Sequence, residues 1–398
     1  MLSRPQNGKP LLREIDGLRF LAILGTILTH ESTFLSKHAP EGLAGLVSSD
    51  LTCQLMFAGC VGVPLFFAIS GFILGLPFAQ AFRGGTAPPS LKQFYWRRLT
   101  RIEPPYLLNL CLFYLILVLC RGISAGELFP HLVASGTYLH YATYGTASLV
   151  NGVAWSLEVE IQFYLLAPLL AQLFRIPSAL LRRSIFALGT LLLACLGRFT
   201  DSAHDWTLAG QLEHFLVGFL AADLFLGLKT QPNQGRGAAF DVLGAASLVG
   251  LVLTSWQGGP QHPLVPLMSL GTFAGALRGN WLKAILASTP ISTLGGMCYT
   301  TYLYHYWIMS VIGWGIYRYL PLPASLPAQA AILGAFMIPA IFIACGGLFL
   351  LTEKPFMKSD WPSRLWNRIR LRRDASPGTV PSAVIVEAAP EMPRRRAA

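Results

Sequence analysis

Two ionisable side chains lie inside an apolar stretch near the amino terminus. Arg19 and His30 belong to the run Asp-Gly-Leu-Arg-Phe-Leu-Ala-Ile-Leu-Gly-Thr-Ile-Leu-Thr-His, which begins at Asp16. If this run is a helix, eleven positions bring the two side chains to within about 20° of one face, separated by about 16 Å along the axis. A cation and a proton acceptor then share a face, and ionisable residues inside a membrane span indicate function because they are costly there. The structural alternatives are an arginine that snorkels to the membrane boundary and a neutral histidine bonded between helices.

A second group of candidates precedes a later apolar run. Arg98 and Arg101 are three residues apart, so that one helical face presents both forked guanidinium groups, which suit phosphate oxygens. The alternative is that these arginines only anchor the cytoplasmic end of a span.

The third candidate is a carboxylate in the segment Trp-Ser-Leu-Glu-Val-Glu that begins at Trp155. Glu160 enters the membrane from the side that His30 approaches, and a histidine oriented by a carboxylate can activate a hydroxyl. Glu160 is therefore the predicted partner of His30, and a packing role for this carboxylate is the alternative. Asp16 is expected to pair with Arg19, three residues further along the helix.

A fourth group lies in the run Cys-Tyr-Thr-Thr-Tyr-Leu-Tyr-His that begins at Cys298. Tyr299 and Tyr302 share a helical face, and His305 is a further buried titratable group. These side chains are expected to line a cavity or to donate to a developing oxyanion, unless they form only a structural aromatic stripe.

The composition shows what must position these residues. Of the 398 residues 53% are hydrophobic and 12% are charged, whereas charged residues make up about a quarter of soluble domains. We expect an all-α polytopic membrane helix bundle. The ten predicted spans are residues 14–34, 55–80, 104–120, 153–174, 184–198, 208–228, 239–256, 262–278, 297–317 and 328–351.

Charge sets the predicted orientation of these spans. With both termini in the cytoplasm, the cytoplasmic segments contain 25 of the 30 lysines and arginines. This bias explains the net charge of +11 without nucleic-acid binding. The predicted units are a cytoplasmic segment (1–13), a transmembrane domain (14–355), and a basic juxtamembrane segment with a disordered cytoplasmic tail (356–398), in which residues 361–373 are expected to lie as a helix on the inner leaflet.

Two further segments carry expectations of their own. Residues 121–152 are predicted to form an outer segment, partly re-entrant. The seven cysteines contain no Cys-x-x-Cys pair, so no metal cluster is predicted. Cys53 and Cys60 are interpreted as two free thiols, with a disulfide as the alternative.

Five short motifs, in this order, resemble those of the membrane-bound acyltransferase-3 family. They are Asp16-Gly-Leu-Arg19-x10-His30, Arg98-x-x-Arg101, Trp155-Ser-Leu-x-Val-Glu160, Tyr299-x-x-Tyr302-Leu-x-His305 and Glu353-x-Pro355. Each motif is weak alone, and together they extend over nearly the whole membrane region. Glu158, at a position that the family does not fix, and Cys298, in place of the usual serine, depart from the pattern.

The resemblance implies a bacterial inner-membrane enzyme that takes an acyl group, by default acetyl, from cytoplasmic acyl-CoA. The acceptor would be a hydroxyl, typically of an extracytoplasmic glycan, and no metal is implied. Arg19 and His30 match the family's essential pair, Arg98 and Arg101 its basic motif, and Glu160 its acidic position.

The expected mechanism joins this resemblance to the spacing. His30 acts as the general base, and Arg98, Arg101 and Arg19 hold the CoA phosphates. Asp16, Trp155, Tyr299, Tyr302 and His305 contribute to the cavity. We expect the form without a fused esterase-like domain, and the oligomeric state is left open. The rival interpretations are a transporter of a glycan precursor or small molecule, and an acyltransferase that acts on an antibiotic or a lipid.

Overall fold

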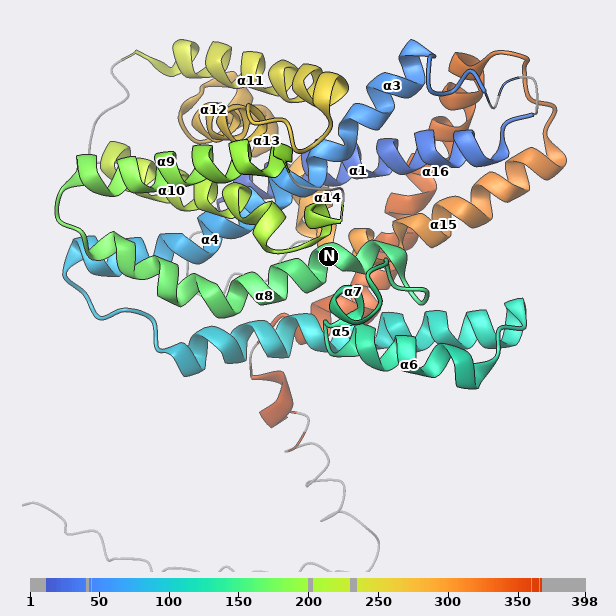
Figure 1. Cartoon of the computed structure of the whole chain (residues 1–398), viewed down its shortest axis with the longest axis horizontal. Coiled ribbons are helices and arrows are strands. Elements are labelled where there is room, and N and C mark those ends of the chain that lie inside the picture. The colour runs from blue at the N-terminus through green and yellow to red at the C-terminus, as the bar shows by residue number, and fades with distance from the viewer. Residues whose placement is uncertain are drawn as a thin grey trace, which may run out of the picture. The chain divides into compact units, whose positions relative to one another are not determined.

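The computed structural model describes residues 12–40, 43, 45–199, 203–229, 235–358, 360–364 and 366. Contacts divide the chain into two units, Met1–Lys358 and Ser359–Ala398. Every regular element in the described parts is a helix (Figure 1). The prediction of an all-α chain is confirmed for these residues.

A helix lies at each of the ten predicted spans. These helices are α1 (Arg13–His38), α4 (Gly62–Gly84), α5 (Leu91–Arg121), α8 (Trp155–Leu170), α9 (Ala179–Leu196), α10 (Leu212–Lys229), α11 (Gly237–Gly258), α12 (Val265–Arg278), α15 (Cys298–Tyr319) and α16 (Leu326–Leu348). Seven helical segments are long and apolar enough to cross a membrane, and α1, α12 and α15 are not among them. These seven segments support a multi-pass membrane protein. The count of ten spans and the cytoplasmic location of both termini stay predictions.

Shorter helices connect or extend these ten. They are α3 (Leu51–Phe57), α6 (Ala125–Gly136), α7 (His140–Tyr144), α13 (Trp281–Leu286) and α14 (Thr289–Gly296), together with the 3-10 turns η1 (Ala58–Val61), η2 (Gly152–Ala154), η3 (Ala171–Arg175), η4 (Gly197–Phe199), η5 (His204–Trp206), η6 (Ala209–Gln211) and η8 (Lys354–Phe356) and the π turn η7 (Phe349–Glu353).

The segment 121–152 folds back along the helix that precedes it. Gly122, in the left-handed region at φ 67°, ends α5, and α6 then packs beside α5 (Figure 1). The Tyr106 hydroxyl of α5 donates to the Ser135 carbonyl of α6 over 3.0 Å. The predicted outer segment is thus a helical hairpin with α5, followed by the single turn α7.

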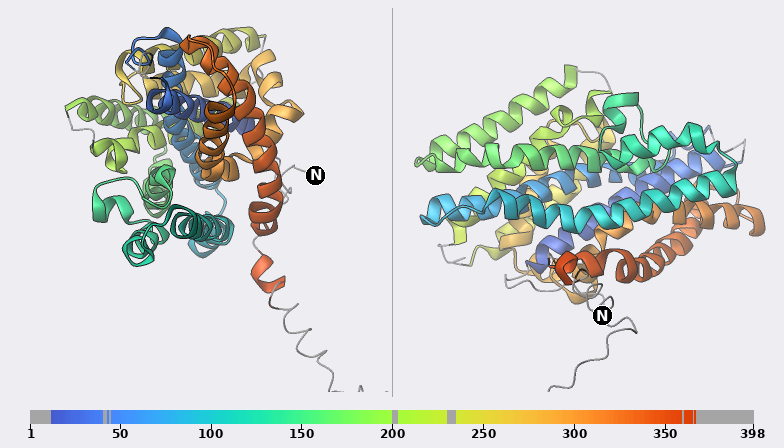
Figure 2. Two further views of the ribbon diagram at one scale, coloured as in Figure 1. Left: turned by 90° about the vertical axis from the view of Figure 1, so that its right-hand side faces the viewer. Right: turned by 90° about the horizontal axis from the view of Figure 1, so that it is seen from below.

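Helix α1 is packed on several sides. It contacts α4, α14, α15 and α16, and both views of Figure 2 show it among other helices. Two glycines allow the closest approach, because a side chain on either Gly25 of α1 or Gly59 of η1 would collide with the backbone of the other. Small residues of this kind bring helix backbones together in membranes, where apolar surface gives little drive for association.

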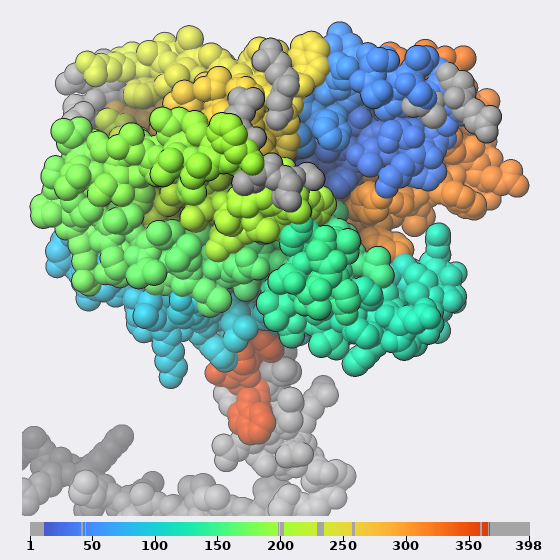
Figure 3. Space-filling model, in the orientation of Figure 1, coloured from blue at the N-terminus to red at the C-terminus, as the bar shows by residue number. Residues whose placement is uncertain are grey.

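The exterior of the first unit carries many apolar side chains. Figure 3 shows the face to which α8, α9 and α10 contribute. On α9, Leu180 is 79% exposed and Leu188 is 65% exposed. Large contiguous apolar surfaces mark membrane or protein contacts, so this face fits a lipid environment.

The second unit is described only in part. Residues 361–364 are helical, and Arg364 pairs with Asp360 over 3.0 Å. The rest of the predicted interfacial helix, residue 365 and most of 366–373, lies outside the described residues.

Candidate active site

Arg19 and His30 lie on the single helix α1, as predicted, and both approach α15. The His30 ring lies 5.1 Å from the His305 ring of α15, centroid to centroid. Arg19 is within electrostatic range of Cys298, the first residue of α15. Helices α15 and α1 therefore lie side by side from the level of Arg19 to the level of His30.

Aromatic rings surround the half-buried His30. Besides His305, the ring of Tyr306 meets it edge-on at 5.2 Å. These neighbours leave the imidazole in a mainly apolar setting that is still partly open. A neutral imidazole in such a place can accept a proton from a hydroxyl.

The hydrogen bonds of His305 fix its tautomer. Its Nδ1 lies 3.1 Å from the Thr301 carbonyl and 2.8 Å from the Tyr302 carbonyl. Since carbonyl oxygens only accept, Nδ1 carries the hydrogen and Nε2 of the neutral ring is an acceptor. That Nε2 is buried and has no hydrogen-bond partner among the described residues. A buried acceptor without a partner is uncommon, and here it belongs to the ring beside His30.

Tyr302 connects this region to the start of α8. Its hydroxyl donates to the Val153 carbonyl over 2.6 Å. The Ser156 hydroxyl lies 2.6 Å from the same oxygen and donates to it, because the only hydrogen of the Tyr302 hydroxyl is already used. The motif that begins at Trp155 and the motif that contains His305 are thus joined directly, 146 residues apart in the chain.

Glu160 is bonded elsewhere than expected. Its Oε1 accepts from the Ser70 hydroxyl over 2.5 Å and from the Tyr164 hydroxyl over 2.6 Å. The carboxylate is within electrostatic range of Arg19 and Arg98. The structure therefore brings Glu160 to the arginine end of α1, and among the described contacts it does not pair with His30. The predicted pairing was inferred from the direction of chain entry alone, which leaves depth undetermined.

The arginines form a charged group with three carboxylates. Arg19 Nη1 lies 2.6 Å from Asp16 Oδ1, which is the pair that the three-residue spacing predicts. The Arg98 guanidinium stacks on the Phe94 ring at 3.5 Å and donates to the Phe94 carbonyl. Arg101 lies 3.8 Å from Glu353. Each arginine keeps some exposure, so this group can still meet an anion.

Glu353 and Tyr299 complete the arginine end. The Glu353 carboxylate is fully buried and accepts from the backbone and hydroxyl of Thr300, the latter over 2.7 Å. The Tyr299 hydroxyl donates to the Ile102 carbonyl over 2.9 Å. These contacts join the start of α15 to α5 and to the π turn η7.

Sequence reasoning missed the residues that hold the candidates in place. Ser70 gave no signal, because it lies in an apolar run on a distant helix. Tyr164 could have been found, since it follows Glu160 by four residues and so shares its helix face. Tyr306 follows His305 directly and was passed over.

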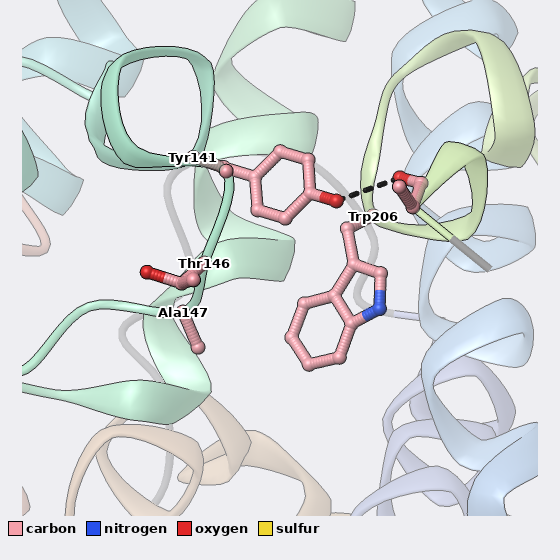
Figure 4. A pocket seen from close by; sticks show the side chains of 6 residues that line it. Tyr141, Thr146, Ala147 and Trp206 are labelled. Carbon is pink, nitrogen blue, oxygen red and sulfur yellow. Dashed lines mark hydrogen bonds between the residues drawn. The ribbon is translucent and has the colours of Figure 1, made fainter.

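A shallow hollow of about 240 Å³ lies between α7 and η5 (Figure 4). Its lining residues are Tyr141, Gly145, Thr146, Ala147, Ala203 and Trp206. The rings of Tyr141 and Trp206 are nearly parallel at 6.0 Å, and the Tyr141 hydroxyl donates to the Ala203 carbonyl. Trp206 also meets Trp155 at 4.8 Å. This hollow therefore adjoins the α8 motif that contacts Tyr302.

Glu158 supports this hollow. Its Oε2 accepts from the backbone N–H of Tyr141 over 3.0 Å. On the other side of the loop, His140 Nδ1 donates to the Thr146 carbonyl over 3.1 Å, so its Nε2 accepts from His131 Nδ1. Burial lowers the pKa of His140, which keeps it neutral. Glu158 thus holds the backbone of α7, which forms one side of the hollow.

All seven cysteines are free, including Cys53 and Cys60. Cys60 Sγ instead lies 3.0 Å from the Ser255 hydroxyl. The interpretation of two free thiols is confirmed. In the described part of the chain, no group of three or more His, Cys, Asp or Glu side chains is arranged to hold a metal ion.

Comparison with known proteins matches residues 12–346 to the acyltransferase domain family, acyltransferase-3. A Staphylococcus aureus protein named "Putative O-acetyltransferase" is 23% identical over 327 residues, 75% of this chain and 50% of that protein. The O-acetyltransferase OatA of Staphylococcus aureus is 24% identical over 320 residues, 73% of this chain and 49% of that protein. The chain spans about half the length of the curated relatives it matches, and no solved structure matches it.

The matched region contains α1, Arg98, Arg101, Glu160 and His305, and so nearly all of the two groups described above. Since the family model covers most of the chain, the shared motifs and the shared domain agree. The chain belongs to the acyltransferase-3 family of membrane acyltransferases.

Proposed function

We propose that the chain is a membrane O-acyltransferase that moves an acyl group, by default acetyl, from cytoplasmic acyl-CoA to a hydroxyl of an extracytoplasmic glycan. The observation that carries the proposal is the arrangement along α1, with a group of arginines around Arg19 and the paired imidazoles of His30 and His305 further along the same helix. Eleven helical residues correspond to about 16 Å. A pantetheine arm has to bridge a distance of this order between its phosphates and its thioester.

The arginine end is suited to the donor. Arg19, Arg98 and Arg101 present guanidinium groups whose forks match phosphate oxygens. Asp16 pairs with Arg19, Glu353 lies 3.8 Å from Arg101 and Glu160 is within electrostatic range of Arg98, so the group is partly neutralised without a ligand and retains capacity for an anion.

The histidine end is suited to proton transfer. His30 accepts the proton of the acceptor hydroxyl as that oxygen attacks the thioester carbonyl, and the thiol of CoA leaves. Nε2 of His305 has no hydrogen-bond partner among the described residues, and its ring lies 5.1 Å from the His30 ring, so we propose that it accepts from His30 once the imidazolium forms. His305 therefore takes the orienting role that the sequence suggested for Glu160.

A change at Glu160 distinguishes a role in donor binding from a role in orienting the base. Glu160→Gln keeps the bonds from Ser70 and Tyr164 in reach but removes the charge between Arg19 and Arg98. We expect the KM for acyl-CoA to fall by roughly 10-fold, because Arg19 and Arg98 lose a carboxylate whose charge competes with the phosphates, with kcat at saturating donor nearly unchanged. Steady-state kinetics at several donor concentrations measures the split. A large fall in kcat at constant KM would instead indicate that Glu160 assists His30, the proposed general base.

Arg98 and Arg101 give a second prediction. Arg98→Ala and Arg101→Ala should each weaken acyl-CoA binding by roughly 10- to 100-fold, because each removes a charged donor to phosphate. Arg121→Ala, at the opposite end of α5, is the matched control and should bind the donor normally. Equilibrium binding of acyl-CoA in detergent measures the effect. If all three variants bind alike, the two arginines are topology anchors.

The hollow between Tyr141 and Trp206 is the proposed acceptor entrance. It combines two aromatic faces with loop hydroxyl and backbone groups, which suits a ligand that is apolar on its faces and polar at its edges. Its contact with Trp155 links it to Tyr302 and so to His305.

Mass spectrometry of cell-surface glycans tests the function as a whole. Cells that express the chain should show glycans heavier by one acyl unit than cells without it, and cells that express His30→Ala should not. An unchanged glycan profile with an acylated lipid or antibiotic would move the proposal to that acceptor. Transport of a glycan precursor without release of CoA would favour a carrier.

A further inference from the structure

A second charged group lies outside the proposed catalytic residues, where the ends of α4 and α10 meet the start of α9. The fully buried Asp223 of α10 pairs with three arginines. Arg182 Nε lies 2.6 Å and Arg183 Nε 2.8 Å from its carboxylate oxygens, and Arg83 Nη1 lies 3.3 Å away. Arg83 also donates to the Asp223 carbonyl over 2.9 Å.

This group has more positive charge than its structural task requires. One carboxylate balances one guanidinium, so three arginines around Asp223 leave an excess of two positive charges. Arg182 is nearly buried, at 3% exposed, and by itself compensates the buried carboxylate. Arg183 is 34% and Arg83 27% exposed. Because Arg182 already balances the charge of Asp223, the like charges of Arg83 and Arg183 repel each other unless a second anion lies near them.

The two exposed guanidinium groups converge on one place. Arg183 Nη2 is 2.5 Å and Arg83 Nη2 is 3.9 Å from the position that a Cβ would take on Gly227 of α10. Glycine therefore leaves room for both groups beside the helix. Arg175, stacked on the Phe82 ring at 4.7 Å, adds a further cation at this end.

Exposed apolar side chains lie beside this group. Helix α9 has the lowest buried share of the seven candidate spans, with 22% of its apolar window buried. Leu180 and Leu181, which directly precede the two arginines of α9, are 79% and 54% exposed. Basic pockets between membrane helices bind the headgroups of anionic lipids.

We infer that Arg83 and Arg183, supported by Arg182 and Asp223, form a binding site for the phosphate of an anionic phospholipid. The phosphate accepts from both guanidinium forks, and the acyl chains lie along the exposed leucines of α9. The site joins α4, α9 and α10 at one end of the bundle, so the bound lipid also stabilises their packing. This inference does not depend on the proposed catalytic function.

Native mass spectrometry of the whole chain in detergent, titrated with phosphatidylglycerol or phosphatidylcholine, tests the site. The unmodified protein should bind phosphatidylglycerol at least 10-fold more tightly than phosphatidylcholine. The Arg83→Gln and Arg183→Gln double variant should lose this preference, while Arg121→Gln, at the opposite end of α5, should keep it. An unchanged preference in the double variant would overturn the inference.

Two further arms keep the test decisive. Gly227→Ala alters no charge but fills the place where the guanidinium groups converge, so it should lower the preference even if the double variant does not fold. The second arm adds 3′,5′-ADP, which carries the phosphates of CoA without a lipid chain. Displacement of phosphatidylglycerol by this nucleotide at equal concentration would show that the site binds acyl-CoA, and it would overturn the inference of a phospholipid site.

Discussion

His30→Ala should remove acyl transfer almost completely while acyl-CoA binding stays within 2-fold of the unmodified protein. General base catalysis contributes about 10²- to 10⁴-fold to a rate, and Arg19, one of the arginines that would hold the donor, lies about 16 Å away along α1. The fall should therefore appear in the rate at saturating donor. Release of CoA thiol in the presence of acceptor measures the rate, and equilibrium binding measures the donor affinity.

His38→Ala is the matched control for this change. His38 lies on the same helix, stacks on Phe34 at 4.1 Å and has its Nδ1 beside the Phe34 carbonyl. It should retain full transfer, because it lies two turns beyond His30 and at the end of α1. Equal transfer by the His30→Ala and unmodified proteins would show that His30 is not the general base. A loss confined to donor affinity would make His30 a binding residue.

Gly295→Ala should prevent stable folding. A methyl group on Gly295 of α14 would overlap the backbone oxygen of Asp16 in α1. Overpacking usually costs about 1–3 kcal/mol and more where nothing can yield, and a backbone oxygen inside a helix cannot rotate away. The shift that relieves the overlap would also displace the Asp16–Arg19 pair. Thermal unfolding in detergent and the yield of folded protein measure the effect.

Gly315→Ala provides the comparison within α15. Apart from the neighbouring backbone of its own helix, no atom of the described residues lies within 4 Å of the position that a Cβ would take on Gly315, so this change should leave stability unchanged or raise it slightly. If the two variants unfold at the same temperature, the close contact of α14 with α1 does not determine the packing of the arginine end.

Much of the arrangement along α1 could be predicted from the sequence. Helical geometry relates Arg19 to His30 and Asp16 to Arg19 within one element, so spacing is enough to place them. Apolar runs likewise indicated the ten long helices, because each run carries its own signal. Local periodicity determined these features, and no knowledge of neighbouring helices was needed.

Contacts between helices could not be predicted in this way. Glu160 was assigned to His30, yet Ser70 and Tyr164 hold it near Arg98. Spacing within α8 says nothing about its depth relative to α1 or about which residue of α4 faces it. His305 shows the same limit, because only the packing of α15 against α1 brings its ring beside His30 and buries its Nε2.

The arginines around Asp223 illustrate a related difficulty. In the sequence Arg83, Arg182 and Arg183 fit the bias of basic residues towards the cytoplasm, and that bias explains each one separately. Only the packing of α4, α9 and α10 shows that they share one buried carboxylate. Glu158 gained its role similarly, through a backbone N–H in a segment whose fold the sequence left open.

The most direct test of the account uses inside-out membrane vesicles from bacteria that express the chain. Acyl-CoA labelled in its acyl group is supplied outside, where the proposed topology exposes the arginine end, and the glycans of the outer face are enclosed. The account predicts label on the enclosed glycans, dependent on His30. Label that stays outside, on acceptors at the same face as acyl-CoA, would contradict a path along α1 from Arg19 to His30.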